Sequence, residues 1–127
     1  MQENQLFEYA VVRIVPRVER EEFLNVGVIL YCAKQKFLRA EFKLNEERIR
    51  NFCAEINIEE VTEHLTTFEK ICDGKEDSGP IGKLLLAERF RWLTATRSTI
   101  LQTSKVHPGF TKDAEKTLQK LLNQLVS

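Results

Sequence analysis

The sequence predicts an α+β domain in which an antiparallel sheet of three to four strands is packed with about four helices. Apolar residues recur with a period of two over residues 1–44, and with a period of about 3.6 over most of the remaining chain. The 127 residues are a typical length for one domain, so we expect residues 1–127 to form a single domain. The 43% of hydrophobic and 30% of charged residues are also close to the globular average.

The first 44 residues predict an antiparallel meander of three strands. Residues 7–15 are rich in β-branched and aromatic side chains and end at Pro16, and their apolar character on both faces predicts a central strand. Residues 23–33 and 37–44 alternate between the two faces of a strand. Only three residues separate these two segments, which predicts a hairpin.

The helical part of the pattern begins at Asn45, a typical N-cap residue. A second helix is predicted from about residue 59 to the glycine of Asp73-Gly74, and a third over residues 84–93. Residues 98–103 predict the late short strand that rejoins the sheet.

A turn is predicted at His107-Pro108-Gly109, before the last helix. That helix is expected to start at Thr111, and its apolar stripe comprises Ala114, Leu118, Leu121, Leu122 and Leu125.

The charge balance argues against a nucleic-acid or membrane partner. The chain has 19 basic and 19 acidic side chains, so it has no excess field to attract an anionic polymer. The distribution is uneven, because residues 45–82 hold ten acidic and four basic side chains, whereas residues 83–107 hold one acidic and five basic. Either two solvated faces simply differ in charge, or the two segments form surfaces for a partner.

Cysteine usage and the N-terminal sequence predict a cytoplasmic protein. The odd number of cysteines, each within an apolar pattern, predicts free thiols in a reducing compartment. Residues 1–6 lack the pattern of a signal peptide, and no apolar run is long enough to cross a bilayer. Neither histidine stands at metal-ligand spacing to a cysteine, so we expect no metal site and no cofactor.

Arg13 is a basic residue inside an otherwise apolar strand. A guanidinium removed from water needs a carboxylate, carbonyl groups or a bound anion as its partner. The residue therefore either pairs with an acid such as Glu22, reaches the sheet edge, or lines an anion pocket.

Asn25 and Gly27 share one face of the next predicted strand. Glycine inside a strand often marks a bulge or a close backbone approach, so this face could be open to a ligand or another chain. The alternative is that Gly27 makes room for a bulky aromatic side chain.

The segment from Thr94 to His107 combines hydroxyl groups with basic side chains, which is chemistry suited to phosphate or carboxylate groups. The alternative is that these hydroxyls form caps and turns. With the two preceding strands, the segment gives a candidate anion site of Arg13, Asn25, Gly27, Arg97, Ser98, Thr99 and His107.

Several enzyme classes lack their characteristic motifs in this sequence. It contains no G-x-x-x-x-G-K-[ST], G-x-G-x-x-G, H-E-x-x-H or G-x-S-x-G. Trp92 lies at core spacing, and without basic residues interleaved on a sheet face it does not indicate a stacking platform for single-stranded nucleic acid. The catalytic residues, if there are any, stay unknown at this point.

An ordered set of motifs lies at residues 9–16, 22–28, 79–82, 88–93, 97–102 and 106–109. These motifs resemble those of the bacterial proteins catalogued as domain of unknown function 3037. The resemblance implies a small stand-alone cytosolic protein with no assigned activity, sometimes encoded beside a HipA-like serine/threonine kinase. The chain departs from the family where Thr94-Ala95-Thr96 precedes Arg97, because a proline before the arginine is common there.

Two functions remain open at the level of sequence. The first is a non-catalytic module that binds a protein partner, such as a HipA-like kinase, with a homodimer as a further expectation. The second is a small anion-binding or nucleotide-phosphate-binding protein, with or without catalysis, that uses Arg13, Asn25, Arg97, Ser98 and His107.

Overall fold

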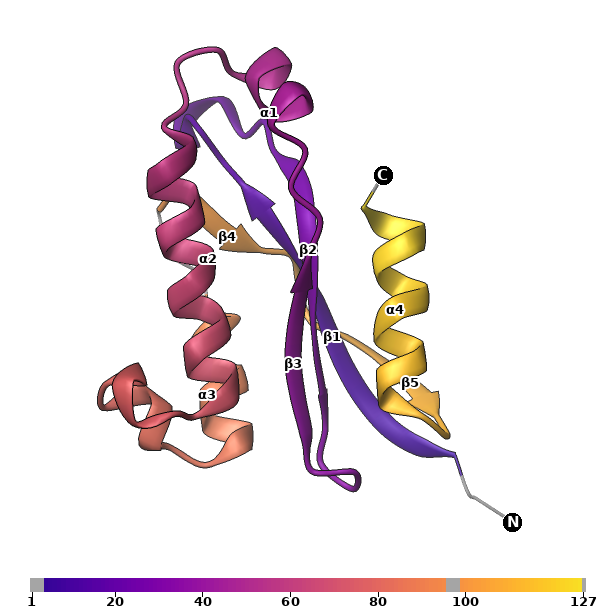
Figure 1. Ribbon diagram of the computed structural model, residues 1–127. Coiled ribbons are helices and arrows are strands. Elements are labelled where there is room, and N and C mark those ends of the chain that lie inside the picture. The colour runs from indigo at the N-terminus through magenta and orange to yellow at the C-terminus, as the bar shows by residue number, and fades with distance from the viewer. Residues whose placement is uncertain (1–3, 96–98, 127) are drawn as a thin grey trace.

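The computed structural model describes residues 4–95 and 99–126, and they form a five-stranded antiparallel sheet with helices on both faces (Figure 1). This arrangement confirms the predicted α+β class. The strands are β1 (Gln5–Ile14), β2 (Leu24–Cys32), β3 (Phe37–Phe42), β4 (Leu101–Thr103) and β5 (His107–Thr111). The helices are α1 (Glu46–Phe52), α2 (Ile58–Asp73), α3 (Leu86–Leu93) and α4 (Ala114–Leu125). Short 3-10 turns cover Val18–Arg20, Glu76–Ser78 and Ile81–Lys83.

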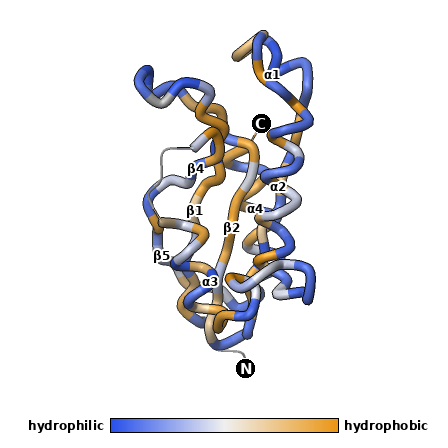
Figure 2. Tube along the Cα trace, turned by 90° about the vertical axis from the view of Figure 1, so that its left-hand side faces the viewer, coloured by the Kyte–Doolittle hydropathy of each residue, from blue (hydrophilic) through white to orange (hydrophobic). Residues whose placement is uncertain are grey.

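β1 is the central strand, as the sequence predicts. It pairs with β2 on one side, and with both β4 and β5 on the other. Two buried clusters cover it. The larger lies between the sheet and α1 to α3, and the smaller lies under α4. In Figure 2 the apolar strands β1 and β2 run through the middle of the molecule.

The prediction of a turn at His107-Pro108-Gly109 is wrong, because these residues begin β5. Proline is compatible with this strand because β5 pairs only with β1 among the described residues. Gly109 lets the ring of Phe7 lie against the backbone, since a Cβ at this position would be 2.5 Å from Phe7 Cζ. The last helix consequently starts at Ala114 rather than Thr111, and Asp113 is its N-cap.

The helix ends follow the capping residues in the sequence. The side chains of Asn45, Asn57 and Asp113 each accept a backbone N–H from the first turn of their helix. Gly74 ends α2 in the left-handed conformation, with a φ of 67°.

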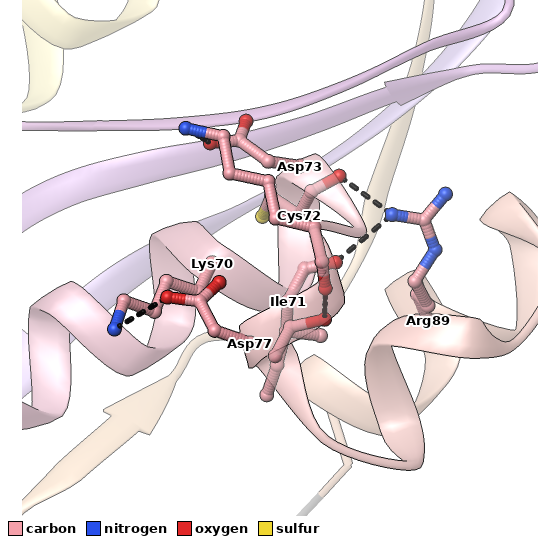
Figure 3. Close-up of polar contacts among 8 residues, drawn as sticks. Lys70, Ile71, Cys72, Asp73, Asp77 and Arg89 are labelled. Atoms are coloured by element: carbon pink, nitrogen blue, oxygen red, sulfur yellow. Dashed lines mark hydrogen bonds and ion pairs between the residues drawn. The ribbon is translucent and has the colours of Figure 1, made fainter.

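Arg89 of α3 caps the C-terminal end of α2 (Figure 3). Its Nη1 donates hydrogen bonds to the carbonyl oxygens of Ile71 at 2.9 Å and Cys72 at 2.7 Å, and its Nε donates to Leu84 at 3.0 Å. The carbonyls of Ile71 and Cys72 lie in the last turn of α2. The last carbonyls of a helix lack intrahelical partners, and a cation beside them is favourable. A Cβ on Gly74 would lie 2.6 Å from Arg89 Nη1, so the glycine also makes room for the guanidinium.

Within the part of the chain that the structure describes, no helix has the length and hydropathy required to span a membrane.

Candidate functional site

A β-bulge brings Arg13 and Asn25 opposite each other. Val12 pairs with Gly27 but Arg13 pairs with Asn25, so Val26 is the extra residue on β2. On its other side Arg13 pairs with Gln102 of β4. Two of the predicted site residues therefore lie side by side, in a row that crosses three strands.

The guanidinium of Arg13 lies over an aromatic ring. Its Cζ is 3.9 Å from the centroid of the Phe23 ring, and Phe23 is itself 46% exposed. No carboxylate among the described residues forms an ion pair with Arg13, and Glu22 instead pairs with Arg20 at 2.6 Å. Arg13 Nε is buried without a hydrogen-bond partner among those residues, and burial lowers the pKa of the guanidinium.

Asn25 connects this position to the end of α4. Its Nδ2 donates a hydrogen bond of 3.2 Å to the carbonyl oxygen of Leu125, in the last turn of the helix. Its Oδ1 is buried and accepts no hydrogen bond within the described chain. The negative end of the α4 dipole therefore lies next to Asn25.

The other predicted site residues do not join this pair. Gly27 is accounted for by packing, since a Cβ there would lie 2.3 Å from Phe42 Cδ1 and 2.5 Å from the Glu41 carbonyl oxygen. The ring of His107 lies beside that of Tyr9, with a tilt of 35° and centroids 5.3 Å apart. Tyr9 is four residues, or about 13 Å, along β1 from Arg13. Arg97 and Ser98 lie outside the described residues.

Thr99 lies at a different feature, a hollow of about 160 Å³ between α2, α3 and β4, which we call the Trp92 hollow. Its apolar lining is Phe68, Ile71, Trp92, Leu93, Ala95 and Leu101, and its polar lining is His64, Thr67, Thr99, Gln102 and Thr103. Trp92 is 39% exposed, so it is not the core residue that its spacing in the sequence indicates.

Sequence reasoning identified part of the polar lining but not the hollow itself. Thr99, Gln102 and Thr103 belong to the hydroxyl-bearing segment that the sequence singled out. The exposure of Trp92 has no local signature in the sequence, because it depends on how α2, α3 and β4 pack together.

The size of the Trp92 hollow limits what it can hold. Pockets for drug-sized ligands or cofactors measure roughly 300–1,000 Å³, whereas a cavity of about 150 Å³ accommodates a benzene ring. A hollow of about 160 Å³ thus fits one apolar side chain, with hydroxyl and amide groups around it. Among the described residues, no group of three or more His, Cys, Asp or Glu side chains is placed to hold a metal ion.

The family model described as "Protein of unknown function (DUF3037)" matches residues 9–126. The chain belongs to the DUF3037 family. The match includes residues 9–14 of β1 and the whole of β2 to β5. It also includes Arg13 and Asn25 beside the β-bulge and all residues of the Trp92 hollow. No curated protein and no solved structure is significantly similar to the chain.

The free thiols of this DUF3037 protein differ in their surroundings. Cys32 and Cys72 are buried, and Cys53 is partly exposed. Burial, followed by the charge of Asp73, raises the pKa of Cys72 to about 12, so its thiol is protonated at neutral pH. Cys72 is accordingly a packing residue beside β3.

Proposed function

We propose that this DUF3037 protein is a cytoplasmic, non-catalytic module that binds a protein partner through the Trp92 hollow. The observation that carries the proposal is an apolar hollow, the size of one side chain, beside a partly exposed tryptophan and within a polar rim. Energetically dominant interface positions are typically aromatic or arginine anchors in small pockets, surrounded by polar groups.

The lining residues explain how such an anchor would be held. Phe68, Ile71 and Leu93 are buried and belong to the larger core cluster, so the floor of the hollow is preformed and rigid. Burying one Leu or Phe side chain there contributes about 1.5–3 kcal/mol. A HipA-like serine/threonine kinase, the partner class implied by the family resemblance, is the first candidate to supply it.

A pair of neighbouring substitutions tests this proposal. Thr67 is exposed and lines the hollow, so Thr67→Tyr places a ring where the partner's anchor would sit. We expect the affinity for the purified HipA-like kinase of the same organism to fall at least about tenfold, the equivalent of about 1.4 kcal/mol. Calorimetric titration of the two purified proteins measures this.

Thr66→Tyr is the matched control, because Thr66 is also exposed on α2 but does not line the hollow. Exposed substitutions of this kind change stability by about 0.5 kcal/mol or less. Equal affinities for the two variants would contradict the proposed surface, and the absence of binding by the unmodified chain would contradict the proposed partner.

A second function, binding of a small anion, is favoured by the surroundings of Arg13. Its guanidinium is held on the ring of Phe23 and has no carboxylate partner in the described chain. Arginine in such a position matches the geometry of carboxylate and phosphate groups. Asn25, directly across the strand pair, is the neighbouring polar side chain.

The substitution Arg13→Met tests this second function. Methionine keeps the packing on the ring of Phe23 and removes a partly desolvated charge, so we expect the free energy of unfolding to stay unchanged or rise by up to about 1 kcal/mol. Thermal melts with inorganic phosphate are expected to show stabilisation of the unmodified chain and none of Arg13→Met. A saturating anion, at a hundred times its dissociation constant, stabilises by about 2.7 kcal/mol.

Arg17→Met provides the control for non-specific anion binding, since Arg17 is exposed and already pairs with Glu55 at 3.5 Å. An identical phosphate response in all three proteins would rule out a site at Arg13. A loss of more than about 1 kcal/mol of stability in Arg13→Met would show instead that the arginine is structural.

A further inference from the structure

Strand β5 forms an edge of the sheet, since within the described chain it pairs with β1 alone. His107, Pro108 and Phe110 are exposed, and in Figure 2 β5 lies at the left-hand margin of the molecule. The exposure of these three residues shows that no helix of the described chain covers this edge.

Hydrogen bonds at Val11 fix the direction of the backbone groups along β1. Its amide donates to Ser104 Oγ at 2.8 Å, and its carbonyl oxygen accepts from the Ser104 amide at 2.8 Å. Both groups therefore point to the side of β1 on which β4 and β5 lie. Because the direction alternates from residue to residue, the groups of Tyr9 point to the same side and bond to its partner, His107.

The same alternation leaves two residues of β5 with backbone groups that point outward. His107 faces β1, so Gly109 and Thr111 face it as well, whereas Pro108 and Phe110 face away from the sheet. The edge thus offers the carbonyl groups of Pro108 and Phe110 and the N–H group of Phe110. A strand added here must suit this set, because proline has no N–H group to donate.

The side chains beside this edge include an exposed apolar pair. Leu6 and Phe110 are partners across β1 and β5, and they are 52% and 71% exposed. Two residues along on the same face, Glu8 is the partner of Pro108, and Arg91 donates to Glu8 at 2.7 and 2.8 Å. Exposed apolar side chains next to an unpaired strand edge are typical of a surface that binds another chain.

A second copy of this chain fits the edge through a two-fold axis. The five residues of β5 overlap the β5 of a second copy completely when the axis passes beside Gly109. In this antiparallel register the outward N–H of Phe110 in each copy meets the outward carbonyl of Pro108 in the other. On one face a row then runs from Leu6 through Phe110 to Pro108 of the second copy, and it ends at Glu8 of that copy.

Charge does not oppose this association. The chain has 19 basic and 19 acidic side chains, so two copies carry no net charge to repel each other. Glu8 and Arg91, at the end of the apolar row, neutralise each other within one copy. The fit requires a phenylalanine opposite Pro108 and a proline opposite Phe110, and an antiparallel second β5 supplies both.

We propose that two copies of this chain associate through the outer edges of β5, so that their two sheets join into one. Only a short strand and a few side chains of each copy take part. Interfaces that bury less than about 1,200 Å² are typically weak, so we expect a dissociation constant of about 1–100 µM. The proposal is independent of the Trp92 hollow, whose lining includes no residue of β5.

Sedimentation equilibrium of the full chain measures this association. The mass is expected to rise from 14.8 kDa in dilute solution towards twice that value at about 500 µM. Phe110→Lys is expected to weaken the dimer at least about tenfold, because it removes the apolar ring and brings two positive charges together. Phe110→Thr, which keeps a residue suited to a strand, is also expected to weaken it.

Leu85→Lys is the matched control, because Leu85 is 73% exposed, lies outside β5 and undergoes the same change of charge. This substitution is expected to alter the dissociation constant by less than about twofold. The proposal would be overturned by a chain that stays at 14.8 kDa at about 500 µM, or by a Phe110→Lys variant that dimerises as well as Leu85→Lys.

Amide hydrogen exchange shows whether the copies pair through the strand edge. The Phe110 amide faces outward, so it is expected to exchange at least about threefold more slowly at about 500 µM than in dilute solution. The Gly109 amide points to β1 and is expected to be protected at both concentrations. A dimer whose Phe110 amide exchanges as quickly as in the dilute chain would contradict pairing through β5.

Discussion

Replacing Arg89 by methionine is expected to lower the free energy of unfolding by about 3 kcal/mol. The arginine side chain donates hydrogen bonds to the carbonyl oxygens of Ile71, Cys72 and Leu84. In the variant all three carbonyls lose this charged donor. A hydrogen bond to a charged group contributes about 1.5–3 kcal/mol, and partly buried acceptors left without a donor add to the loss. Urea denaturation followed by circular dichroism measures the change.

Arg91→Met is the control for this experiment, since Arg91 is two residues away on the same helix. Arg91 forms a bidentate pair with Glu8, at 2.7 and 2.8 Å, but its side chain is largely exposed. Exposed ion pairs contribute at most about 1 kcal/mol, so the smaller loss is expected here. If Arg89→Met lowered the free energy of unfolding no more than Arg91→Met does, this would contradict the role of Arg89 in capping the C-terminal end of α2.

Replacing Gly27 by alanine is expected to cost a similar amount, about 3 kcal/mol, through overpacking between β2 and β3. The added methyl group would lie 2.3 Å from Phe42 Cδ1 and 2.5 Å from the Glu41 carbonyl oxygen. The ring could move, but the carbonyl belongs to the neighbouring strand and can yield only if the strands separate. Urea denaturation again provides the measurement.

Phe42→Leu separates the two contacts of the added methyl group. In that background the clash with the ring is relieved and the clash with the carbonyl stays, so Gly27→Ala is expected to cost less than in the unmodified chain. A neutral Gly27→Ala in the unmodified chain would instead support the reading of Gly27 as a position open to a ligand.

Most of the fold follows from local patterns in the sequence. The β-branched and aromatic content of residues 7–15 identifies β1, and the alternation in residues 23–33 and 37–44 identifies β2 and β3. The capping residues Asn45 and Gly74 mark helix ends where the structure has them. β5 could not be predicted in this way, because its Pro108 and Gly109 are typical of turns. Pro108 and Gly109 are compatible with a strand here only because β5 pairs with β1 on one side.

The functional features depend more on contacts between distant segments. Arg13 and Asn25 each stood out in the sequence, but the bulge that sets them opposite each other is a property of the strand pair. The contact of Arg89 with the end of α2 spans 17 and 18 residues, so no periodic pattern reports it. The Trp92 hollow likewise requires the packing of α2, α3 and β4.

The presence of a single tryptophan permits a direct test of the proposed partner surface. A chain labelled with 5-fluorotryptophan has one fluorine resonance, which reports Trp92 alone. Titration with the unlabelled HipA-like kinase is predicted to shift this resonance until the two proteins are equimolar, and Thr67→Tyr is predicted to weaken the response. A resonance that keeps its position while the complex forms would contradict binding through the Trp92 hollow.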